Sequence, residues 1–258
     1  MRVFVTGVSG FIGRSLAPAL KARGHEVRSA IDGCNAVVHL ANIAHTSASL
    51  GELRRVNVEG TIAQAEAALA AGARRFVYLS SIKAAQPDDA YGRTKSEAER
   101  ALLRLKGLEV VILRPPLVYG PRVKANFLTL LRAVDRGWPL PLASIDNRRS
   151  LVYVGNLVDA ILRCLEAPQS AGRTYAVGDG VPVSTPDLVR AIARALGRTA
   201  RLVPFPPLML RRIPALRRLT DSLEVDDSAI RTELGWRPPY TFEEGLRATA
   251  AWYLAQGR

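Results

Sequence analysis

An α/β fold with a parallel, doubly wound sheet is predicted by two features of the sequence. In the first 80 residues, short segments rich in β-branched residues alternate with longer segments of helical periodicity, and a glycine-spaced turn follows the first of them. Parallel strands need a helical crossover between them, so this alternation is typical of strand–helix–strand units. The expected strands are RVFVT (2–6), HEV (25–27), NAVVHLA (35–41), RRFVYLS (74–80) and EVVILRP (109–115).

Helical spacing marks three of the intervening segments. We expect helices in FIGRSLAPALKARG (11–24), in VEGTIAQAEAALAAGA (58–73) and from about Asp89 to Lys106. Beyond residue 116 the pattern changes to proline-rich connections and shorter elements, which we interpret as a smaller α/β lobe that completes a cleft. The expected domains are 1–116 plus 148–170, and 117–147 plus 171–258.

Composition favours a soluble globular protein. The 258 residues, 48% of them hydrophobic, can bury a substantial core, and no apolar run approaches the roughly 18 to 20 residues that span a bilayer. The start, MRVFVTGVSG, lacks the features of a signal peptide. Cys34 and Cys164 lie far apart, which argues against a disulfide framework and against a metal site. We therefore expect a cytoplasmic protein without metal.

The net charge of +13 raises the alternatives of a nucleic-acid or membrane partner. Its carriers are mostly arginines scattered through the expected helices, which is typical of solvated helix faces, so we expect no nucleic acid and no stable membrane insertion. The densest basic stretch is MLRRIPALRRL (209–219). A helix of the smaller lobe, with arginines facing solvent or a phosphate, is preferred there over a helix on a membrane surface.

Three glycines follow the first strand. Gly7, Gly10 and Gly13 in TGVSGFIG have the spacing GxxGxxG and open the first expected helix. A tight turn and close approach of a pyrophosphate both require residues without a Cβ atom, and a helix N-terminus offers free N–H donors to an anion. The pattern predicts a Rossmann-type domain that binds a dinucleotide.

The segment YGRTK (91–95) places Tyr91 and Lys95 one helical turn apart. Taken alone, this spacing is compatible with two ordinary surface residues as well as with a catalytic pair.

Further motifs carry a family resemblance. TGVSGFIG (6–13), HLA (39–41), NVEGT (57–61), YLSS (78–81), YGRTK, LRPPLVYGP (113–121) and RSLVYV (149–154) occur in this order. Together they resemble the extended short-chain dehydrogenase/reductases, in the NAD-dependent epimerase/dehydratase family that acts on nucleotide sugars. The resemblance runs from residue 1 to about 252 and is strongest to the bacterial envelope-polysaccharide branch.

This resemblance implies catalytic roles for Ser81, Tyr91 and Lys95. Tyr91 would exchange a proton with the sugar hydroxyl, and the Lys95 ammonium would lower the tyrosine pKa from its ordinary value of about 10. Lys95 would also hold the nicotinamide ribose, and Ser81 would orient the reacting sugar oxygen. Ser80 is the alternative to Ser81.

The resemblance also implies the binding residues for the cofactor, NAD or NADP, with NAD preferred. They are Gly7, Gly10, Phe11, Ile12, Gly13, Leu40, Ala41, Tyr91, Lys95, Pro115 and Val118. Ser81, Asn126 and Arg149 would bind the nucleotide sugar, the last two at its diphosphate. The alternatives are that Asn126 caps a helix and that Arg149 only pairs with an acid.

Four other polar residues are not assigned to catalysis or binding. Asn57 is expected to hold the backbone by hydrogen bonds, and His39 to pack at the end of a buried strand. His25 and His45 stand apart from any carboxylate cluster in the sequence.

The sequence departs from the family in two ways. Leu117 replaces an asparagine that is common in relatives, and RSAIDGC (28–34) covers an interval that in relatives holds a helix and a strand. The missing interval would form a wall of the adenine pocket of the cofactor site, whereas the glycine loop that needs this pocket is intact. These two features of the sequence conflict. We therefore expect a chain interruption near residues 29–32 and another between Lys83 and Asp88, with Cα separations far above the about 3.8 Å of a peptide link.

The implied function is epimerisation at C4 of a UDP-hexose or UDP-N-acetylhexosamine through a 4-keto intermediate. A 4-ketosugar reductase driven by NAD(P)H is the nearest alternative, and a non-catalytic dinucleotide-binding protein is an alternative of another class. Relatives pair the helices that correspond to residues 52–71 and 89–106, which implies a homodimer.

Overall fold

The computed structural model describes residues 1–44, 48–212 and 219–256, which form two compact units. Unit 1 comprises Met1–Pro116, Leu157–Val177 and Asp226–Arg237, and unit 2 comprises Leu117–Asn156, Gly178–Val225 and Pro238–Arg258. The first boundary coincides with the expected one. Later in the chain, residues 148–156 lie in unit 2, whereas 171–177 and 226–237 lie in unit 1.

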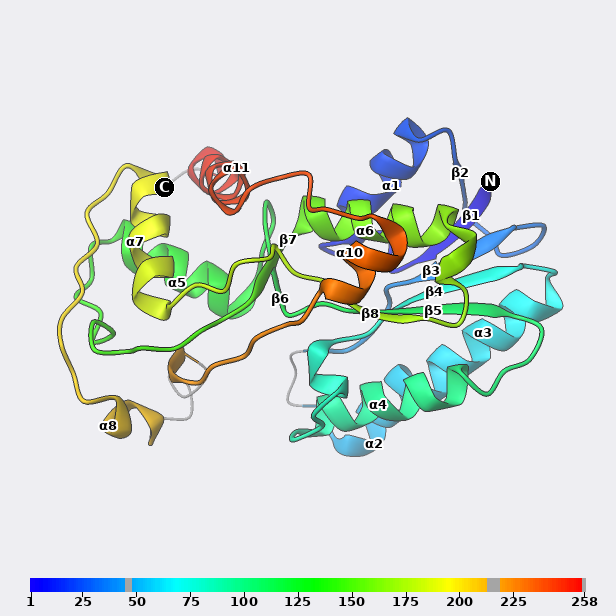
Figure 1. Ribbon diagram of the computed structural model, residues 1–258, viewed down its shortest axis with the longest axis horizontal. Coiled ribbons are helices and arrows are strands. Elements are labelled where there is room, and N and C mark those ends of the chain that lie inside the picture. Colours follow the sequence, from blue (N-terminus) through cyan, green and yellow to red (C-terminus); the bar gives the residue numbers. More distant parts are fainter. Residues whose placement is uncertain (45–47, 213–218, 257–258) are drawn as a thin grey trace. The chain divides into compact units, whose positions relative to one another are not determined.

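Unit 1 contains a six-stranded parallel sheet, as predicted. Its strand order is β2-β1-β3-β4-β5-β8 (Figure 1). The strands are β1 (Arg2–Thr6), β2 (Glu26–Arg28), β3 (Ala36–His39), β4 (Arg75–Leu79), β5 (Glu109–Arg114) and β8 (Thr174–Ala176). Every neighbouring pair is parallel. The carboxyl ends of β1, β3, β4 and β5 therefore face one edge of the sheet.

Helices cover both faces of this sheet. Figure 1 shows α3 and α4 on one face and α1 and α6 on the other. Their bounds are α1 (Gly13–Ala22), α2 (Leu50–Arg54), a π-helix (Arg55–Glu59), α3 (Gly60–Ala70), a short 3-10 helix (Ile82–Ala84), α4 (Ala90–Leu102), α6 (Val154–Glu166), a second 3-10 helix (Pro168–Ser170) and α10 (Ser228–Leu234). The three helices expected in this part of the chain are confirmed.

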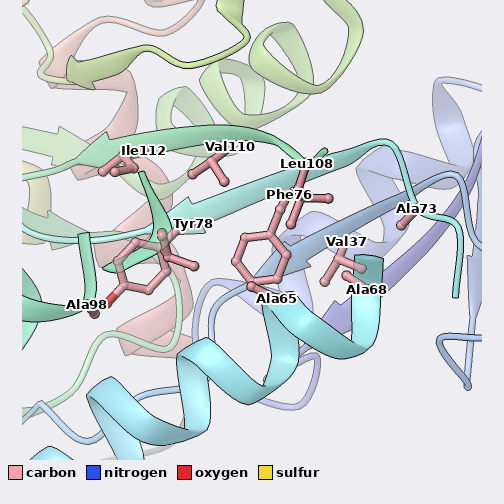
Figure 2. Packing of buried hydrophobic residues seen from close by; sticks show 11 residues of the cluster. Val37, Ala65, Ala68, Ala73, Phe76, Tyr78, Ala98, Leu108, Val110 and Ile112 are labelled. Carbon is pink, nitrogen blue, oxygen red and sulfur yellow. The ribbon is translucent and has the colours of Figure 1, made fainter. Parts of the chain in front are cut away.

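Small residues let α3 approach the sheet closely. Ala65 and Ala68 are fully buried, and Figure 2 shows the Phe76 ring of β4 directed at the helix that carries them. All five residues of β4 are buried, as expected of a central strand covered on both faces. The β-branched and aromatic run RRFVYLS therefore forms the middle of the core.

Arg75 joins the start of β4 to the end of α6. Its Nη1 donates to the carbonyl oxygens of Cys164 (3.1 Å), Leu165 (2.9 Å) and Ala167 (2.7 Å), and its Nη2 lies 2.6 Å from a Glu109 carboxylate oxygen. The last carbonyls of a helix lack partners within the helix. A buried guanidinium thus satisfies several of them at once.

The two shortened intervals are closed turns. Between β2 and β3 the Cys34 N–H donates to the Ile31 carbonyl (3.1 Å) and its thiol to the Ala30 carbonyl (3.3 Å). In the second interval the Ala85 N–H donates to the Ile82 carbonyl (3.1 Å) and the Asp88 N–H to the Gln86 carbonyl (2.9 Å). These bonds lie within each turn and do not measure the Cα separations, so the expected interruptions stay a prediction.

The short turn between β2 and β3 also determines which strand lies at the edge of the sheet. No helix or strand lies between β2 and β3 in this fully described segment, and β2 is the edge strand. A three-residue strand is too short to present a long unpaired edge.

His25 corrects an expectation. Its Nε2 lies 3.0 Å from a Glu166 carboxylate oxygen, and Glu166 also pairs with Arg23 at 3.2 Å. This histidine therefore lies beside a carboxylate that is 141 positions away in the sequence, which no local pattern reveals. His45 lies outside the described residues.

Unit 2 has its own small parallel pair, β6 (Leu117–Tyr119) with β7 (Leu151–Tyr153). Its helices are α5 (Ala125–Asp135), α7 (Thr185–Leu196), α8 (Pro207–Arg211) and α11 (Phe242–Ala255). Partly buried hydrogen bonds to one carboxylate hold β7: both Asp179 oxygens accept from the Tyr153 N–H, and one of them also accepts from the Tyr119 hydroxyl at 3.0 Å.

Only part of the basic stretch 209–219 is described. α8 ends at Arg211, and residues 213–218 lie outside the described residues, so the expectation for this helix is not tested. Among the described helices, none combines the length and apolar character that crossing a bilayer requires.

Candidate active site

The glycine loop is a tight turn between β1 and α1. Gly7 has φ +71°, in the left-handed region that favours glycine, and its carbonyl accepts from the Gly10 N–H at 2.9 Å. A Cβ atom on Gly13 would lie 2.3 Å from the Gly7 carbonyl oxygen and 2.6 Å from Val8 Cα. Since these are backbone atoms, no side chain other than hydrogen fits at Gly13. The GxxGxxG spacing is thus a requirement of the turn itself.

The turn leaves the N-terminus of α1 free of competing side chains. Ile12, the N-cap residue, makes no capping hydrogen bond through its side chain, and the first turn carries no acid. Gly10 is exposed, and Phe11 is partly exposed. Free N–H groups at the positive end of a helix suit a phosphate.

The end of β3 is bonded to the end of β1. The Thr6 hydroxyl oxygen lies 3.2 Å from the backbone nitrogens of both Leu40 and Ala41, and a Cβ on Gly7 would lie 3.0 Å from the Ala41 nitrogen. The glycine loop therefore lies against the expected Leu40–Ala41 segment, and the structure brings these cofactor-binding candidates together.

His39 is a neutral packing residue, as interpreted. It is buried, its Nδ1 lies 2.8 Å from the Thr6 hydroxyl, and its Nε2 lies 3.2 Å from the Thr61 hydroxyl. Because the Thr61 hydroxyl donates to the Asn57 carbonyl, it accepts from His39 Nε2–H, which fixes the tautomer. Burial, and then the charge of Lys95, lower the pKa of His39 to about 3.

The two serines after β4 have different surroundings. Ser80 is buried and donates to a Glu99 carboxylate oxygen at 2.5 Å. Ser81 is only partly buried, and its hydroxyl accepts from the Lys83 N–H at 3.3 Å. The Ser81 hydroxyl can therefore donate a hydrogen bond to another acceptor, whereas the Ser80 hydroxyl already donates to Glu99.

Tyr91 lies in the first turn of α4. The Asp89 side chain caps this helix by accepting from the Gly92 N–H at 2.8 Å, and it also pairs with Lys83. A Cβ on Gly92 would lie 2.7 Å from the Lys83 carbonyl oxygen, so glycine is needed for α4 to pack on that loop. Burial, and then the Asp89 carboxylate, raise the pKa of Tyr91 above its ordinary value.

Lys95 points into the unit. Its side chain is 1% exposed, its Nζ donates to the Leu79 carbonyl at 2.9 Å, and the same nitrogen lies 4.5 Å from the Tyr78 ring centroid and 5.9 Å from that of Tyr91. Burial lowers the pKa of Lys95 from 10.5 to about 7, against the opposing effect of Glu99. Burial of both side chains acts against the expected lowering of the Tyr91 pKa by Lys95, which stays a prediction.

Asn57 is a structural residue, as interpreted. Its side chain accepts from the Ile43 N–H at 2.8 Å and donates to the Ile43 carbonyl at 3.0 Å. It lies in the π-helix Arg55–Glu59, a widened turn often found near functional sites. The amide thus ties the segment after β3 to the helix layer beside Thr94, whose hydroxyl lies 3.4 Å away.

The remaining predicted residues fall in both units. Pro115, in unit 1, is buried and accepts from the Ile82 N–H at 3.0 Å. In unit 2, Val118 lies in β6, and Asn126 is exposed in the first turn of α5. Lys124, and not Asn126, is the N-cap residue of α5, so the capping alternative for Asn126 is excluded.

Arg149 is largely engaged within unit 2. Its Nη1 donates to the Asp221 carbonyl at 2.8 Å, and its backbone exchanges two hydrogen bonds of 2.9 Å with Val183. Burial lowers the pKa of this guanidinium, and the Asp221 charge opposes that effect. Both the expected phosphate contact and the alternative of an acid partner remain compatible with this position.

Sequence reasoning missed two charged residues next to the site. Glu99, in α4, is 3% exposed, and Arg114, at the end of β5, pairs with it. One signal was available: Glu99 follows Lys95 by four residues and thus shares its helix face. Arg114 could not have been found by spacing, because only the pairing of β4 with β5 brings it there.

The glycine turn, the parallel sheet and the Tyr91–Lys95 helix together define a dinucleotide-binding enzyme fold. Comparison with known proteins specifies the family. A model of the NAD-dependent epimerase/dehydratase family matches residues 27–178. The UDP-glucose 4-epimerase of Vibrio cholerae is 36% identical over 98% of this chain and 95% of its own length.

More distant relatives have other activities. The ceramide reductase of Caulobacter vibrioides is 27% identical over 99% of this chain and 95% of its own length. Among solved structures, RMD of Pseudomonas aeruginosa in complex with NADPH superposes with a TM-score of 0.82 at 24% identity, over 99% of each chain. That structure supports the fold.

The chain therefore belongs to the NAD-dependent epimerase/dehydratase family, a family of enzymes. The expected family, the doubly wound fold and a nicotinamide cofactor are thereby confirmed.

Proposed function

We propose that the protein is a nucleotide-sugar 4-epimerase that acts on a UDP-hexose or a UDP-N-acetylhexosamine. The observation that carries the proposal is the 36% identity to a UDP-glucose 4-epimerase over nearly the whole of both chains. The presence of Ser81, Tyr91 and Lys95 at the carboxyl edge of the parallel sheet supports it. In open α/β sheets this edge is where ligands bind.

The glycine loop fits a dinucleotide. Because Gly13 admits no Cβ atom, a pyrophosphate would approach the backbone of the loop closely at the N-terminus of α1. The residues that would hold the cofactor are Gly7, Gly10, Phe11, Ile12, Gly13, Leu40, Ala41, Tyr91, Lys95, Pro115 and Val118. When bound, the nicotinamide accepts and returns the hydride of the redox chemistry. We take NAD as the cofactor, in keeping with the family.

The protein's own groups would control the proton. Tyr91 would take the proton of the sugar C4 hydroxyl as that carbon is oxidised. It would return the proton after the 4-keto sugar has rotated to present its other face. Ser81 donates a hydrogen bond to the reacting oxygen. Burial raises the pKa of Tyr91, so this role needs a nearby positive charge, and Lys95 is the buried cation one helical turn away.

Asn126 and Arg149 would bind the diphosphate of the substrate. A guanidinium can bind two phosphate oxygens at once, which suits the diphosphate of a nucleotide sugar. The phosphate contact is tested by replacing Arg149 with Lys, which keeps the positive charge and removes the planar guanidinium that binds two oxygens. We expect a higher KM for the UDP-sugar and an unchanged affinity for NAD.

One assay separates the proposal from its nearest alternative. The purified protein is incubated with UDP-glucose or UDP-N-acetylglucosamine in two parallel reactions. One reaction has no added cofactor, and the other has a catalytic amount of NAD. Formation of the C4 epimer without net consumption of NAD supports the epimerase. A stoichiometric requirement for NAD(P)H with a 4-ketosugar supports a reductase, which the similarity to a ceramide reductase keeps in consideration.

A non-catalytic dinucleotide-binding protein is the alternative of another class. Loss of the tyrosine or the lysine is typical of such proteins, and this chain has both. Binding of NAD with no turnover of any UDP-sugar or 4-ketosugar would favour it.

We also propose a homodimer built on the helices of residues 52–71 and 89–106. Leu69 of α3 and Leu103, just after α4, are exposed apolar residues on these helices and support the proposal. Light scattering at micromolar concentration tests it, and a monomer would contradict it. A cytoplasmic location completes the proposal, supported by two cysteines that are buried and unpaired.

A further inference from the structure

An ionic cluster around a buried carboxylate lies next to the candidate catalytic residues, and none of its members is one of those residues. It consists of Ser80, Glu99 and Arg114, and this set is named the Glu99 cluster. Ser80 donates to one carboxylate oxygen of Glu99 at 2.5 Å, and Arg114 Nε lies 3.0 and 3.2 Å from the two oxygens. Arg114 Nη2 makes a further close bond to the carboxylate.

The cluster joins three elements at the carboxyl edge of the sheet. Ser80 follows β4, Arg114 ends β5, and Glu99 belongs to α4. The Ser80 N–H also donates to the Leu113 carbonyl at 2.8 Å. Ser81, the candidate for orienting the substrate oxygen, is the next residue along the chain. The position of Ser81 relative to α4 is therefore set through Ser80 and Glu99.

The same carboxylate lies one helical turn from Lys95 on α4. Lys95 has two kinds of neighbour: its Nζ bonds to the Leu79 carbonyl and lies over the Tyr78 ring, and neither supplies a full negative charge. The titratable groups that face it are His39 of β3, Tyr78 of β4, and Tyr91 and Glu99 of its own helix. Among these, only Glu99 is an acid of the carboxylate type.

We propose that Glu99 is a positioning residue of the active site: its buried carboxylate, one helical turn from Lys95, favours the protonated form of that lysine, and through Ser80 it fixes the strand end that carries Ser81. The catalytic part of this inference rests on the proposed function, because it matters only if Lys95 and Tyr91 act on a substrate. The electrostatic part does not, and it can be measured on the protein alone.

The test is direct titration of Lys95. The chain has only five lysines, Lys21, Lys83, Lys95, Lys106 and Lys124, so protein labelled with ¹³C at lysine Cε gives five resonances, and Lys95→Met assigns one of them. In the wild-type protein, burial lowers the pKa of Lys95 to about 7. In Glu99→Gln we expect the Lys95 midpoint about 1 pH unit lower or more, the usual effect of a nearby charge.

Glu97→Gln is the matched control. It removes the same charge from the same helix, but Glu97 pairs with Arg54 at 2.7 Å and is partly exposed. We expect the Lys95 midpoint to stay within about 0.3 pH unit, because solvent screens exposed charges. A Lys95 midpoint in Glu99→Gln that equals that of Glu97→Gln overturns the proposal, whatever the activity of either variant.

Two further variants keep the test informative if Glu99→Gln fails to fold. Glu99→Leu combined with Arg114→Leu removes both members of the ion pair, a replacement that proteins tolerate well, and Lys95 should still titrate lower. Ser80→Ala keeps the carboxylate and removes one hydrogen bond to it. We expect it to leave the Lys95 midpoint nearly unchanged while reducing kcat about 10-fold. An unchanged midpoint in the double variant, or an unchanged kcat in Ser80→Ala, contradicts the corresponding half of the proposal.

Discussion

Replacement of Lys95 by Met should stabilise the protein at neutral pH. Burial lowers the pKa of Lys95 from 10.5 to about 7, and at about 1.36 kcal/mol per pH unit this corresponds to a cost of about 5 kcal/mol for holding the charged form in the folded protein. The substitution also removes the bond to the Leu79 carbonyl, which costs about 1–3 kcal/mol. The expected net gain is about 2–4 kcal/mol.

The gain should depend on pH with a definite sign. Below pH 7 the lysine is charged in both states, and the folded protein bears the full cost. Between about pH 7 and 10.5 the unfolded chain holds more protons than the folded one, so the stability of the wild-type protein rises with pH. Methionine has no proton to lose. Its advantage should therefore fall by about 3 kcal/mol between pH 7 and pH 9.5.

Urea denaturation of both proteins at pH 7 and pH 9.5, followed by tryptophan fluorescence, measures this difference. Lys106→Met is the control, because Lys106 is exposed and its replacement should change the free energy of unfolding little at either pH. A Lys95→Met advantage that is the same at both pH values would refute the assignment of a buried, charge-penalised lysine. Loss of NAD affinity in the same variant is expected from the proposed ribose contact.

Tyr91→Phe should keep the fold and the NAD affinity and reduce turnover at least about 100-fold, and near-normal turnover would end its assignment as the proton-transferring residue. Gly13→Ala places a Cβ atom 2.3 Å from a backbone oxygen and should abolish NAD binding in calorimetry, whereas Gly51→Ala, whose nearest contact is at 3.9 Å, should leave it unchanged. Arg75→Met should reduce the free energy of unfolding by about 3–5 kcal/mol because it leaves three carbonyls without their donor and removes the buried partner of Glu109. Arg74→Met removes an exposed partner of the same acid and should cost under about 1 kcal/mol; equal losses would show that the bonds to α6 contribute nothing.

The sheet could be predicted because its strands are local patterns. Central parallel strands are buried on both faces, so β4 and β5 read as nearly uninterrupted apolar runs, and the glycine turn marks the first crossover. The place of β8 could not be predicted in the same way. It has three residues and pairs with β5 from 60 residues farther along the chain, and no local pattern encodes that pairing.

The site shows the same division. Helical spacing predicts that Tyr91 and Lys95 share a face of α4, and they do. Spacing does not say whether that face meets solvent or a packed interior. Burial acts against the expected electrostatics, since it lowers the pKa of Lys95 and raises that of Tyr91. The partners of Glu99 likewise depend on which strand ends lie over the helix, which is a property of the assembled sheet.

The composition of unit 1 from three separate chain segments has a consequence for biosynthesis. Its last strand, β8, and the helix that packs against it, α10, are translated long after β1 to β5. During translation the outer edge of β5 is unpaired until residues 174–176 emerge, and α10 is completed only at residue 234. Domains generally fold as units during synthesis, so the nascent first half of this chain exposes an open sheet edge to the ribosome exit and its chaperones. A chain truncated before Thr174 would lack β8, so the outer edge of β5 would stay unpaired.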